Sequence, residues 1–250
     1  MNKEKFNSIE KLYHYTSFDT ALKILLTNSL RFGKLEQMND VNESYRSVFY
    51  SNKSIIDSIN VENALKEYQQ ISFTHDTDCC NGYNIPSMWG HYGDKGYGVC
   101  LVFNKHKILS YLDKECWCDD ITYSTKYNGT INIEKKDIHL FFENHKNEIF
   151  FTKTKDWEYE QEFRILKRNL SNGTDVFNYR DSLVSVIMYF ANDVEKSESI
   201  FNSVNVKIIK RILPNLNILE LGNLLGESNL RDSEGNDWLI NKLENKELDL

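Results

Sequence analysis

The segment Lys155–Leu166, KDWEYEQEFRIL, alternates charged and apolar residues with the period of a β-strand. Successive side chains of a strand point to opposite faces of the sheet. One face of the predicted strand therefore carries four charged residues: Glu158, Glu160, Glu162 and Arg164. The opposite face carries Tyr159, Phe163 and Ile165. Two explanations fit this pattern: a polar strand face turned towards water, or a site that recognises hydroxyl groups or stabilises positive charge.

The order of the predicted elements favours an α+β fold. Strands are predicted at residues 12–16, 30–32, 71–74, 96–103, 121–127, 182–190 and 206–213. Helices are predicted after Ser17 or Asp19 and at residues 61–70, 87–92 and 133–151. The absence of regular βαβ alternation predicts a single domain with a central mixed, largely antiparallel sheet flanked by helices. This domain is predicted to span residues 1–222, followed by a polar C-terminal extension, 223–250, with a docking helix at Trp238, Leu239 and Leu243.

Composition limits the class of protein. The chain has 250 residues, of which 40% are hydrophobic and 13% aromatic, with only two prolines, as in a folded globular protein. Its net charge of −7 argues against a mainly electrostatic grip on nucleic acid, although a local basic groove would escape this test. The polar start MNKEKFNSIE lacks a signal-peptide core, and no apolar run is long enough for a membrane span. We therefore expect a cytoplasmic protein without a membrane partner.

The five cysteines favour a reduced protein without a metal. They are Cys79, Cys80, Cys100, Cys116 and Cys118. An odd number and close spacing argue against a disulfide framework. Structural zinc sites usually have at least two residues between the ligands of a pair, whereas Cys79 and Cys80 are adjacent. Buried, inert thiols are the prediction.

Two further motifs carry candidate site residues. His14 lies on a predicted strand and shares a face with Thr16, so it is either a histidine hydrogen-bonded to backbone at the core edge or part of a pair that holds a ligand hydroxyl. Residues 87–103, SMWGHYGDKGYGVCLVF, place aromatic side chains among glycines, either as a flat wall for a ligand ring or as core packing. The aromatic candidates are Trp89, Tyr92 and Tyr97. The glycine spacing is not that of a Rossmann fingerprint or a P-loop, which excludes nucleotide binding through those motifs.

Three segments together resemble the DUF2971 family, an uncharacterised, mostly bacterial family. They are LYHYTSFDTALKILLTNSLRFGKLEQMNDVNE, SMWGHYGDKGYGVCLVF and KTKDWEYEQEFRIL, and the resemblance runs from Leu12 to Leu166. The later part of the chain departs from the pattern, because Phe190-Ala191 stands where family members often carry a glycine.

The same segments resemble, more loosely, NAD-dependent ADP-ribosyltransferases. That resemblance implies an ADP-ribosyltransferase-like fold with NAD as substrate and an unknown acceptor, either protein or nucleic acid. It assigns His14 and Thr16 to a ribose hydroxyl and Tyr92 or Tyr97, near Trp89, to the nicotinamide ring. It implies that Glu162 stabilises the positive charge that develops on the ribose, and that Glu160 orients or deprotonates the acceptor.

Two roles for Arg164 and two alternative functions for the protein stay open. The guanidinium of Arg164 would hold both carboxylates ionised or would clamp a phosphate. The resembled bacterial proteins suggest a toxin-like or phage-defence setting for a transferase or NAD hydrolase. One alternative is a metal-dependent nuclease in which Glu158, Glu160, Glu162 and Asp40 bind magnesium. Another is a non-catalytic module that binds a ligand or a partner.

Overall fold

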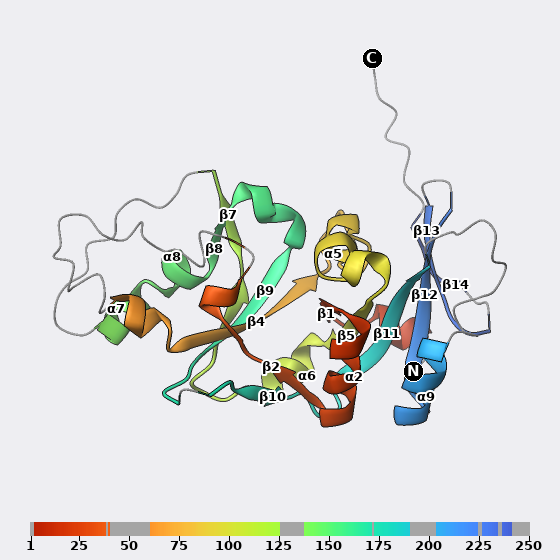
Figure 1. The fold of residues 1–250 in the computed structure, drawn as a ribbon. Helices are drawn as coiled ribbons and strands as arrows, with labels where there is room; N and C mark the ends of the chain where they lie inside the picture. The colour runs from red at the N-terminus through yellow and green to blue at the C-terminus, as the bar shows by residue number, and fades with distance from the viewer. Residues whose placement is uncertain are drawn as a thin grey trace, which may run out of the picture. The chain divides into compact units, whose positions relative to one another are not determined.

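The computed structural model describes residues 3–38, 40, 61–125, 138–171, 173–190, 204–224, 227–234 and 237–241. The chain forms two compact units. Unit 1 comprises Met1–Asn28, His75–Leu109 and Arg180–Leu250, and unit 2 comprises Ser29–Thr74 and Ser110–Tyr179. Each unit combines helices with β-structure (Figure 1), which confirms the predicted α+β class.

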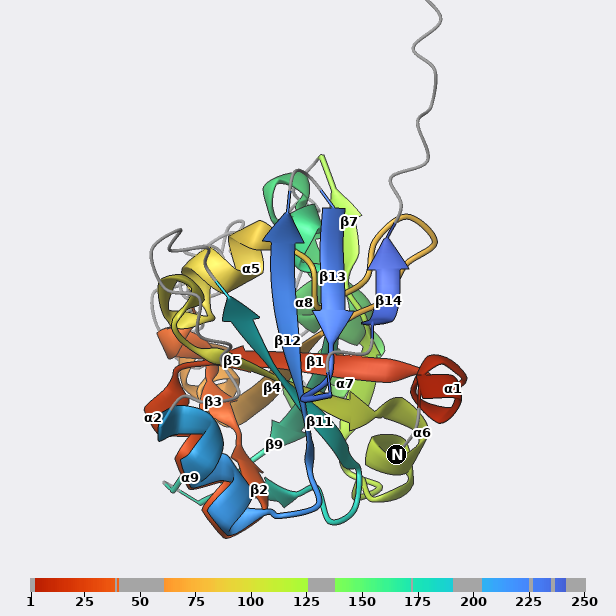
Figure 2. The same cartoon turned by 90° about the vertical axis from the view of Figure 1, so that its right-hand side faces the viewer.

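The sheet of unit 1 has the strand order β14-β13-β12-β11-β5-β1. β11 and β12 are parallel and the other neighbours are antiparallel, as predicted for a mixed, largely antiparallel sheet. Figure 2 shows β12, β13 and β14 side by side. The strands are β1 (Lys11–Thr16), β5 (Val99–Asn104), β11 (Leu183–Phe190), β12 (Asn217–Leu224), β13 (Glu227–Arg231) and β14 (Asp237–Asn241). The helices are α1 (Lys3–Asn7), α2 (Phe18–Thr27), α5 (Pro86–His91), the 3-10 helix η3 (Asp94–Gly96), α6 (Lys105–Ser110) and α9 (Val204–Ile212).

The first strand and helix of unit 1 form from local signals. The side chain of Ser17 caps α2 by accepting a hydrogen bond from the backbone N–H of Thr20. The helix ends at Asn28, which adopts the left-handed conformation that asparagine tolerates better than most residues. Apolar residues at helical spacing bury one side of α2, namely Ala21, Ile24 and Leu25. The predicted strand at 12–16 and the helix after Ser17 are thus confirmed.

Unit 2 is built around β4 (Tyr68–His75) and β9 (Glu162–Arg168). β9 pairs antiparallel with β4 on one side and with β6 (Trp117–Asp120) on the other, and β3 (Gly33–Lys34) pairs with β4. Two small sheets join β2 (Ser29–Arg31) to β10 (Val176–Asn178) and β7 (Thr122–Ser124) to β8 (Thr152–Thr154). The helices are η1 (Leu35–Gln37), α7 (Ile138–Asn144), α8 (Lys146–Phe150) and the 3-10 helix η4 (Lys155–Glu160).

Both faces of β9 are buried. Phe163 and Ile165 lie on the predicted apolar face and are 4% and 0% exposed. On the opposite face, Leu166 packs with Tyr68 and Phe150 in an aromatic-rich core. Glu162 and Arg164 share this second face and are buried with it. The charged face of this strand therefore does not point to water, which overturns the surface explanation for it.

Four sequence predictions of secondary structure are wrong at least in part. The helix predicted at 61–70 ends by residue 65, and residues 68–70 belong to β4. Residues 155–160 form η4 and not the first half of a strand, which begins only at Glu162. The β-branched segment at 206–213 forms most of helix α9, because its apolar residues at helical spacing pack against unit 1. The predicted docking helix around Trp238 is strand β14, paired with β13, while Leu243 lies outside the described residues.

The predicted domain boundary after residue 222 falls within β12, and it remains a prediction. Among the described helices, none combines the length and the apolar character needed to cross a lipid bilayer.

Candidate functional site

The junction between η4 and β9 brings Glu160 and Glu162 to one place. Gln161, between them, adopts the left-handed conformation with φ 44° and ψ 52°, and its backbone N–H bonds to the carbonyl of Glu158. Glu160 is 4% exposed and Glu162 is 3% exposed. Glu158, by contrast, is on the exposed side of η4, where its carboxylate lies 3.9 Å from Lys155 Nζ. The structure therefore brings together two of the three predicted glutamates and separates the third.

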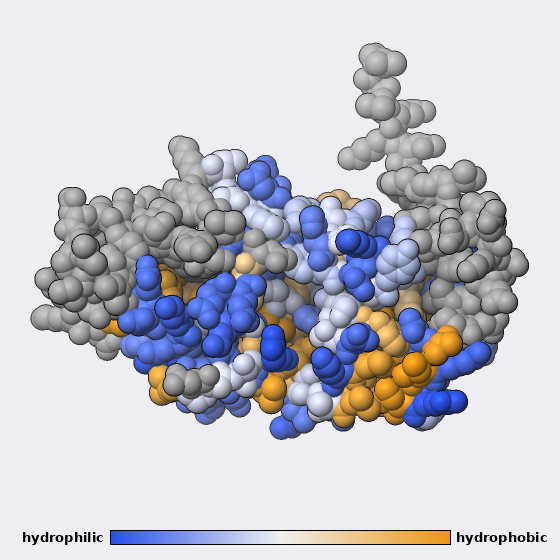
Figure 3. Space-filling model, in the orientation of Figure 1, coloured by the Kyte–Doolittle hydropathy of each residue, from blue (hydrophilic) through white to orange (hydrophobic). Residues whose placement is uncertain are grey.

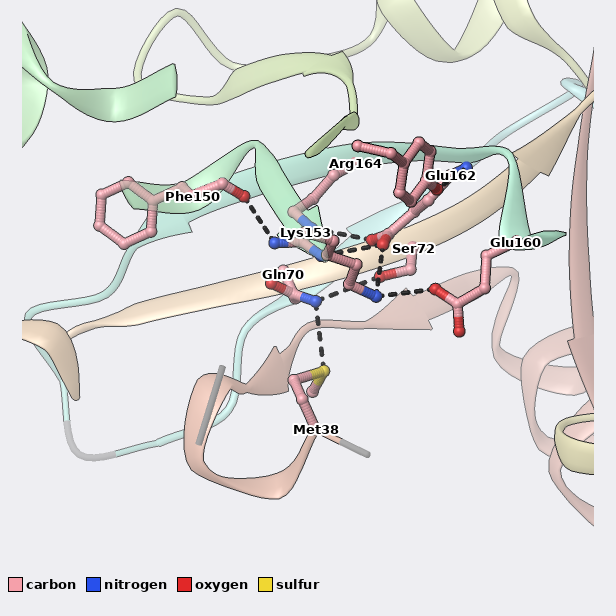
Figure 4. A network of polar contacts seen from close by, with 9 residues as sticks. Met38, Gln70, Ser72, Phe150, Lys153, Glu160, Glu162 and Arg164 are labelled. Carbon is pink, nitrogen blue, oxygen red and sulfur yellow. Dashed lines mark hydrogen bonds and ion pairs between the residues drawn. The ribbon is translucent and has the colours of Figure 1, made fainter. Parts of the chain in front are cut away.

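Glu162 is the centre of a buried ion cluster (Figure 4). Arg164 Nε donates to Glu162 Oε1 at 2.8 Å and Arg164 Nη2 donates to Glu162 Oε2 at 2.9 Å, a bidentate pair. Lys153 Nζ lies 2.8 Å from Glu162 Oε2 and donates to Glu160 Oε2 at 2.7 Å. We call these four residues, Lys153, Glu160, Glu162 and Arg164, the ion cluster. Its two positive and two negative charges balance.

The surrounding backbone fixes these side chains. Arg164 Nη1 donates to the carbonyl of Phe150 at the end of α8. The backbone N–H of Glu162 donates to the Tyr123 hydroxyl at 2.9 Å, and its carbonyl accepts from the N–H of Ile121 at 2.8 Å. Both the side chain and the backbone of Glu162 are thus held by hydrogen bonds. A site that uses a charge in a fixed position requires such restraint.

Electrostatics keep Glu162 ionised. Burial would raise the pKa of its carboxyl, but the charges of Arg164 and Lys153 and their hydrogen bonds outweigh burial. The pKa of Glu162 consequently lies well below its ordinary value of 4.5. Burial also raises the pKa of the neighbouring Tyr123 hydroxyl, which stays protonated at neutral pH.

Strand β4 places polar side chains opposite the ion cluster. Thr74 is the register partner of Glu162 and Ser72 that of Arg164, so these side chains share one face of the sheet. Gln70, two residues further along the same face, donates from Nε2 to Ser72 Oγ and to the sulfur of Met38. Thr74 Oγ1 and Gln70 Oε1 are buried without any hydrogen-bond partner in the described part of the chain. Buried polar atoms are usually bonded, so these two are candidates for contact with a bound molecule.

The other predicted site residues belong to unit 1. His14 and Thr16 lie on β1, where His14 is half-buried and Thr16 is buried. Tyr92 follows α5 and is half-buried, and Tyr97 is 79% exposed. His14 and Thr16 lie on the strand predicted for them, and Tyr92 directly follows the predicted helix. Tyr97 lies in a turn after η3 and not in the strand predicted to begin at residue 96, because β5 begins only at Val99.

Trp89 and Gly98 serve packing in unit 1. The indole of Trp89 is buried, its Nε1–H donates to the carbonyl of Tyr83 at 2.9 Å, and its ring meets that of Tyr15 edge-on. A Cβ on Gly98 would lie 2.3 Å from the carbonyl oxygen of Thr16, so only glycine fits there. For Trp89 and Gly98, the core explanation of the aromatic and glycine-rich motif accounts for the observed contacts.

Sequence reasoning missed Lys153, Thr74 and Gln70. Lys153 precedes Glu160 by seven residues and neutralises two carboxylates at once. The available signal was charge balance, because two buried carboxylates require compensating cations and Arg164 supplies only one. Thr74 and Gln70 had no such signal, because strand pairing alone places them.

The structure gives no support for ion binding by cysteines. No group of three or more His, Cys, Asp or Glu side chains in the described ranges is arranged to hold a metal ion. The prediction of buried thiols is correct for Cys100 and wrong for Cys79 and Cys118, which are exposed. Lys153 Nζ also contacts the carboxylates of Glu160 and Glu162. A magnesium ion bound by those carboxylates would have to displace this ammonium group.

Comparison with known proteins gives one match. Residues 88–165 match the model of the DUF2971 family, described as a protein of unknown function. The chain resembles the DUF2971 family. The matched segment covers the second and third motifs quoted above except Ser87 and Leu166, and it includes all four residues of the ion cluster. No curated protein and no solved structure matches the chain.

Proposed function

We propose that the protein is an NAD-consuming enzyme, which transfers ADP-ribose to an acceptor or hydrolyses NAD. The observation that supports this proposal is a buried, ionised carboxylate, Glu162, opposite Thr74, whose Oγ1 has no hydrogen-bond partner in the described part of the chain. Gln70 Oε1, which also lacks such a partner, lies on the same face of β4 four residues away. A sugar hydroxyl supplies both a donor and acceptors, so a ribose suits these atoms.

The proposed chemistry uses Glu162 as a fixed negative charge. The glycosidic C–N bond breaks, nicotinamide leaves with the bonding electrons, and positive charge develops on the ribose. A carboxylate that is already ionised and oriented stabilises this charge without reorganising. An oxygen of the acceptor or of water then bonds to the ribose carbon, and Glu160 takes its proton. Lys153, which contacts both carboxylates, would keep Glu162 ionised while Glu160 acts as the base.

The acceptor and the other predicted contacts of NAD stay predictions from the sequence. For unit 1, taken by itself, these are contacts of His14 and Thr16 with ribose hydroxyls and of Tyr92 or Tyr97 with the nicotinamide ring. The acceptor, a protein or a nucleic acid, would determine whether the enzyme acts as a toxin-like or phage-defence transferase. Water in place of the acceptor would make it an NAD hydrolase.

A matched pair of substitutions tests the proposal. Glu162→Gln removes the buried charge, whereas Glu158→Gln makes the same change on an exposed residue of the same segment, 51% exposed. We expect Glu162→Gln to reduce nicotinamide release from NAD by about 10²-fold or more and Glu158→Gln to leave it unchanged. Release is measured by chromatography of purified protein with NAD, with and without cell extract as a source of acceptors.

Folding controls keep this result interpretable. Circular dichroism and thermal unfolding of both variants show whether Glu162→Gln still folds. If Glu162→Gln does not fold, Glu160→Gln takes its place. Of the two cations of the cluster, Glu160 contacts Lys153. We expect a similar loss of nicotinamide release from this variant. No nicotinamide release by the wild-type protein under any of these conditions would rule the proposal out.

One observation favours a second candidate, a non-catalytic binding module. Both carboxylate oxygens of Glu162 already accept from Arg164 or Lys153, as in an ion cluster that fixes β8 and β9 in place. In that case the unpartnered atoms of Thr74 and Gln70 would contact a ligand that is bound but not cleaved. NAD that binds in calorimetry without any release of nicotinamide would favour this candidate.

A further inference from the structure

Helices α2 and α9 of unit 1 carry an apolar surface that the rest of the described chain leaves open. On α2, Phe18, Leu22 and Leu26 repeat every four residues, and on α9, Val204, Ile208 and Ile212 do the same. This spacing puts each set on one side of its helix. Leu26 is 64% exposed and Val204 is 68% exposed, and the other four side chains are half-buried. We call these six residues the α2–α9 stripe.

The two helices lie together, so the two sets form one area. α2 and α9 are in contact, and Figures 1 and 2 both draw them side by side. In Figure 3 a continuous hydrophobic area, orange, covers the position of these helices and is bordered by hydrophilic residues. Contiguous apolar area of this kind on a folded protein commonly marks an interaction site.

Positive charges outnumber negative ones beside the stripe. Lys23, Lys207 and Arg211 are exposed, and none of them makes an ion pair with another described residue. α9 contains no acidic residue, and α2 contains one, Asp19. The local excess of positive charge contrasts with the net charge of the whole chain, which is −7. A basic, amphipathic helix face of this type selects a partner with acidic residues beside an apolar strip.

We propose that the α2–α9 stripe docks an acidic amphipathic helix of a partner protein. Two neighbouring helices with exposed apolar ridges accept a third helix whose apolar residues recur every three or four positions. Acidic residues flanking that third helix would pair with Lys23, Lys207 and Arg211. A second copy of this chain fits less well, because a symmetric contact would bring the basic residues of two α9 helices together. An anionic membrane also fits less well, because four of the six side chains are half-buried and do not project for insertion.

Peptide selection tests both the place and the chemistry of the partner. A displayed library of randomised helical peptides, about 18 residues long so that they span several turns, is selected on the full-length protein. We expect the enriched peptides to be amphipathic and to carry more acidic than basic residues beside the apolar side. Enrichment of peptides without an acidic excess, or no enrichment, would overturn the proposal.

Matched variants locate the binding site. Leu26→Asp and Val204→Asp disrupt the stripe, whereas Leu170→Asp and Val176→Asp make the same changes at comparably exposed positions of unit 2, 77% and 63% exposed. Fluorescence anisotropy with the strongest selected peptide should show at least a tenfold loss of affinity for the first two variants and no change for the second two. Equal effects of the two pairs would show that the stripe is not the docking surface.

Charge reversal and two competing occupants complete the test. The double variant Lys207→Glu and Arg211→Glu should bind the acidic peptide more weakly than the wild-type protein does. It should bind a version of the peptide with lysine in place of glutamate more tightly. Binding to vesicles of anionic phospholipid that Val204→Asp abolishes would assign the stripe to a membrane instead. A dimer in analytical ultracentrifugation that Val204→Asp dissociates would assign it to a second copy.

Discussion

Glu162 shows how burial and partners together set the state of one residue. Its carboxylate is removed from water, yet two cations and their hydrogen bonds hold its pKa below the ordinary range. A charge buried with such partners depends on them, because the loss of one partner leaves an uncompensated charge in a medium of low polarity. The stability of unit 2 and the proposed chemistry therefore rest on the same ionisation.

The depressed pKa of Glu162 predicts how stability changes with pH. A carboxylate whose pKa is lower in the folded than in the unfolded state stabilises the fold above the unfolded value and loses that contribution as pH falls towards the folded value. We expect Glu162→Gln to lower the free energy of unfolding by about 3–5 kcal/mol at pH 7. Below the ordinary pKa of 4.5, the difference from wild type should shrink by at most about 1.4 kcal/mol per pH unit.

Urea unfolding at a series of pH values between 7 and 3 measures this difference. Glu158→Gln is the control, because its side chain is 51% exposed and its loss should change stability little at any of these pH values. A difference for Glu162→Gln that stays constant or grows on acidification would contradict the assignment of an ionised, buried Glu162.

At the scale of elements, the junction between η4 and β9 decides what the acidic segment does. A regular strand would have put Glu158, Glu160 and Glu162 on one face. The 3-10 helix and the left-handed Gln161 instead leave Glu158 outside while both buried glutamates reach Lys153. Glu160 and Glu162 lie together around Lys153, but not by the predicted route, because the strand expected over Lys155–Leu166 begins only at Glu162.

Substitutions of Gln161 test the importance of this turn. Its φ of 44° is a conformation that glycine adopts freely and that β-branched residues disfavour by about 1–2 kcal/mol. We expect the free energy of unfolding of Gln161→Gly to lie within about 1 kcal/mol of the wild-type value. We expect that of Gln161→Val to be lower by about 1–2 kcal/mol or more. Thermal unfolding of the two variants measures the difference, and equal stabilities would show that the left-handed turn is not required.

At the scale of the whole molecule, both units are discontinuous in sequence. Unit 1 collects three segments of the chain and unit 2 collects two. The C-terminal strands β13 and β14 extend the sheet of unit 1 beyond β12, where Leu221 and Leu230 are register partners and both fully buried. The polar, acidic composition after residue 222 gives no sign of this role.

A shortened chain tests the boundary predicted at residue 222. We expect a protein that ends at Gly222 to unfold about 2–5 kcal/mol more readily, because β12 loses its neighbour and Leu221 loses the contact with Leu230. The exposed edge of β12 should also promote association between chains. Thermal unfolding and size-exclusion chromatography against the full chain measure both effects, and an unchanged unfolding temperature would support an independent domain of residues 1–222.

The sequence by itself determined the elements whose signals are local. Ser17 and Asn28 delimit α2 through hydrogen bonds to adjacent residues, and the alternation of β9 follows from the fixed geometry of a strand. Helix α9 shows the limit, because β-branched residues such as Val206 and Ile209 favour strands unless packing of a helix face outweighs propensity.

Only the tertiary structure decided the environment of the charges. Whether Glu162 faces water or protein depends on β4, which pairs with β9 from a distant part of the sequence. Which cation meets Glu162 depends on how the chain brings Lys153 of β8 and Phe150 of α8 back to the side chains of β9. Burial and electrostatic interactions depend on distance in space, and no pattern of neighbouring residues specifies those distances.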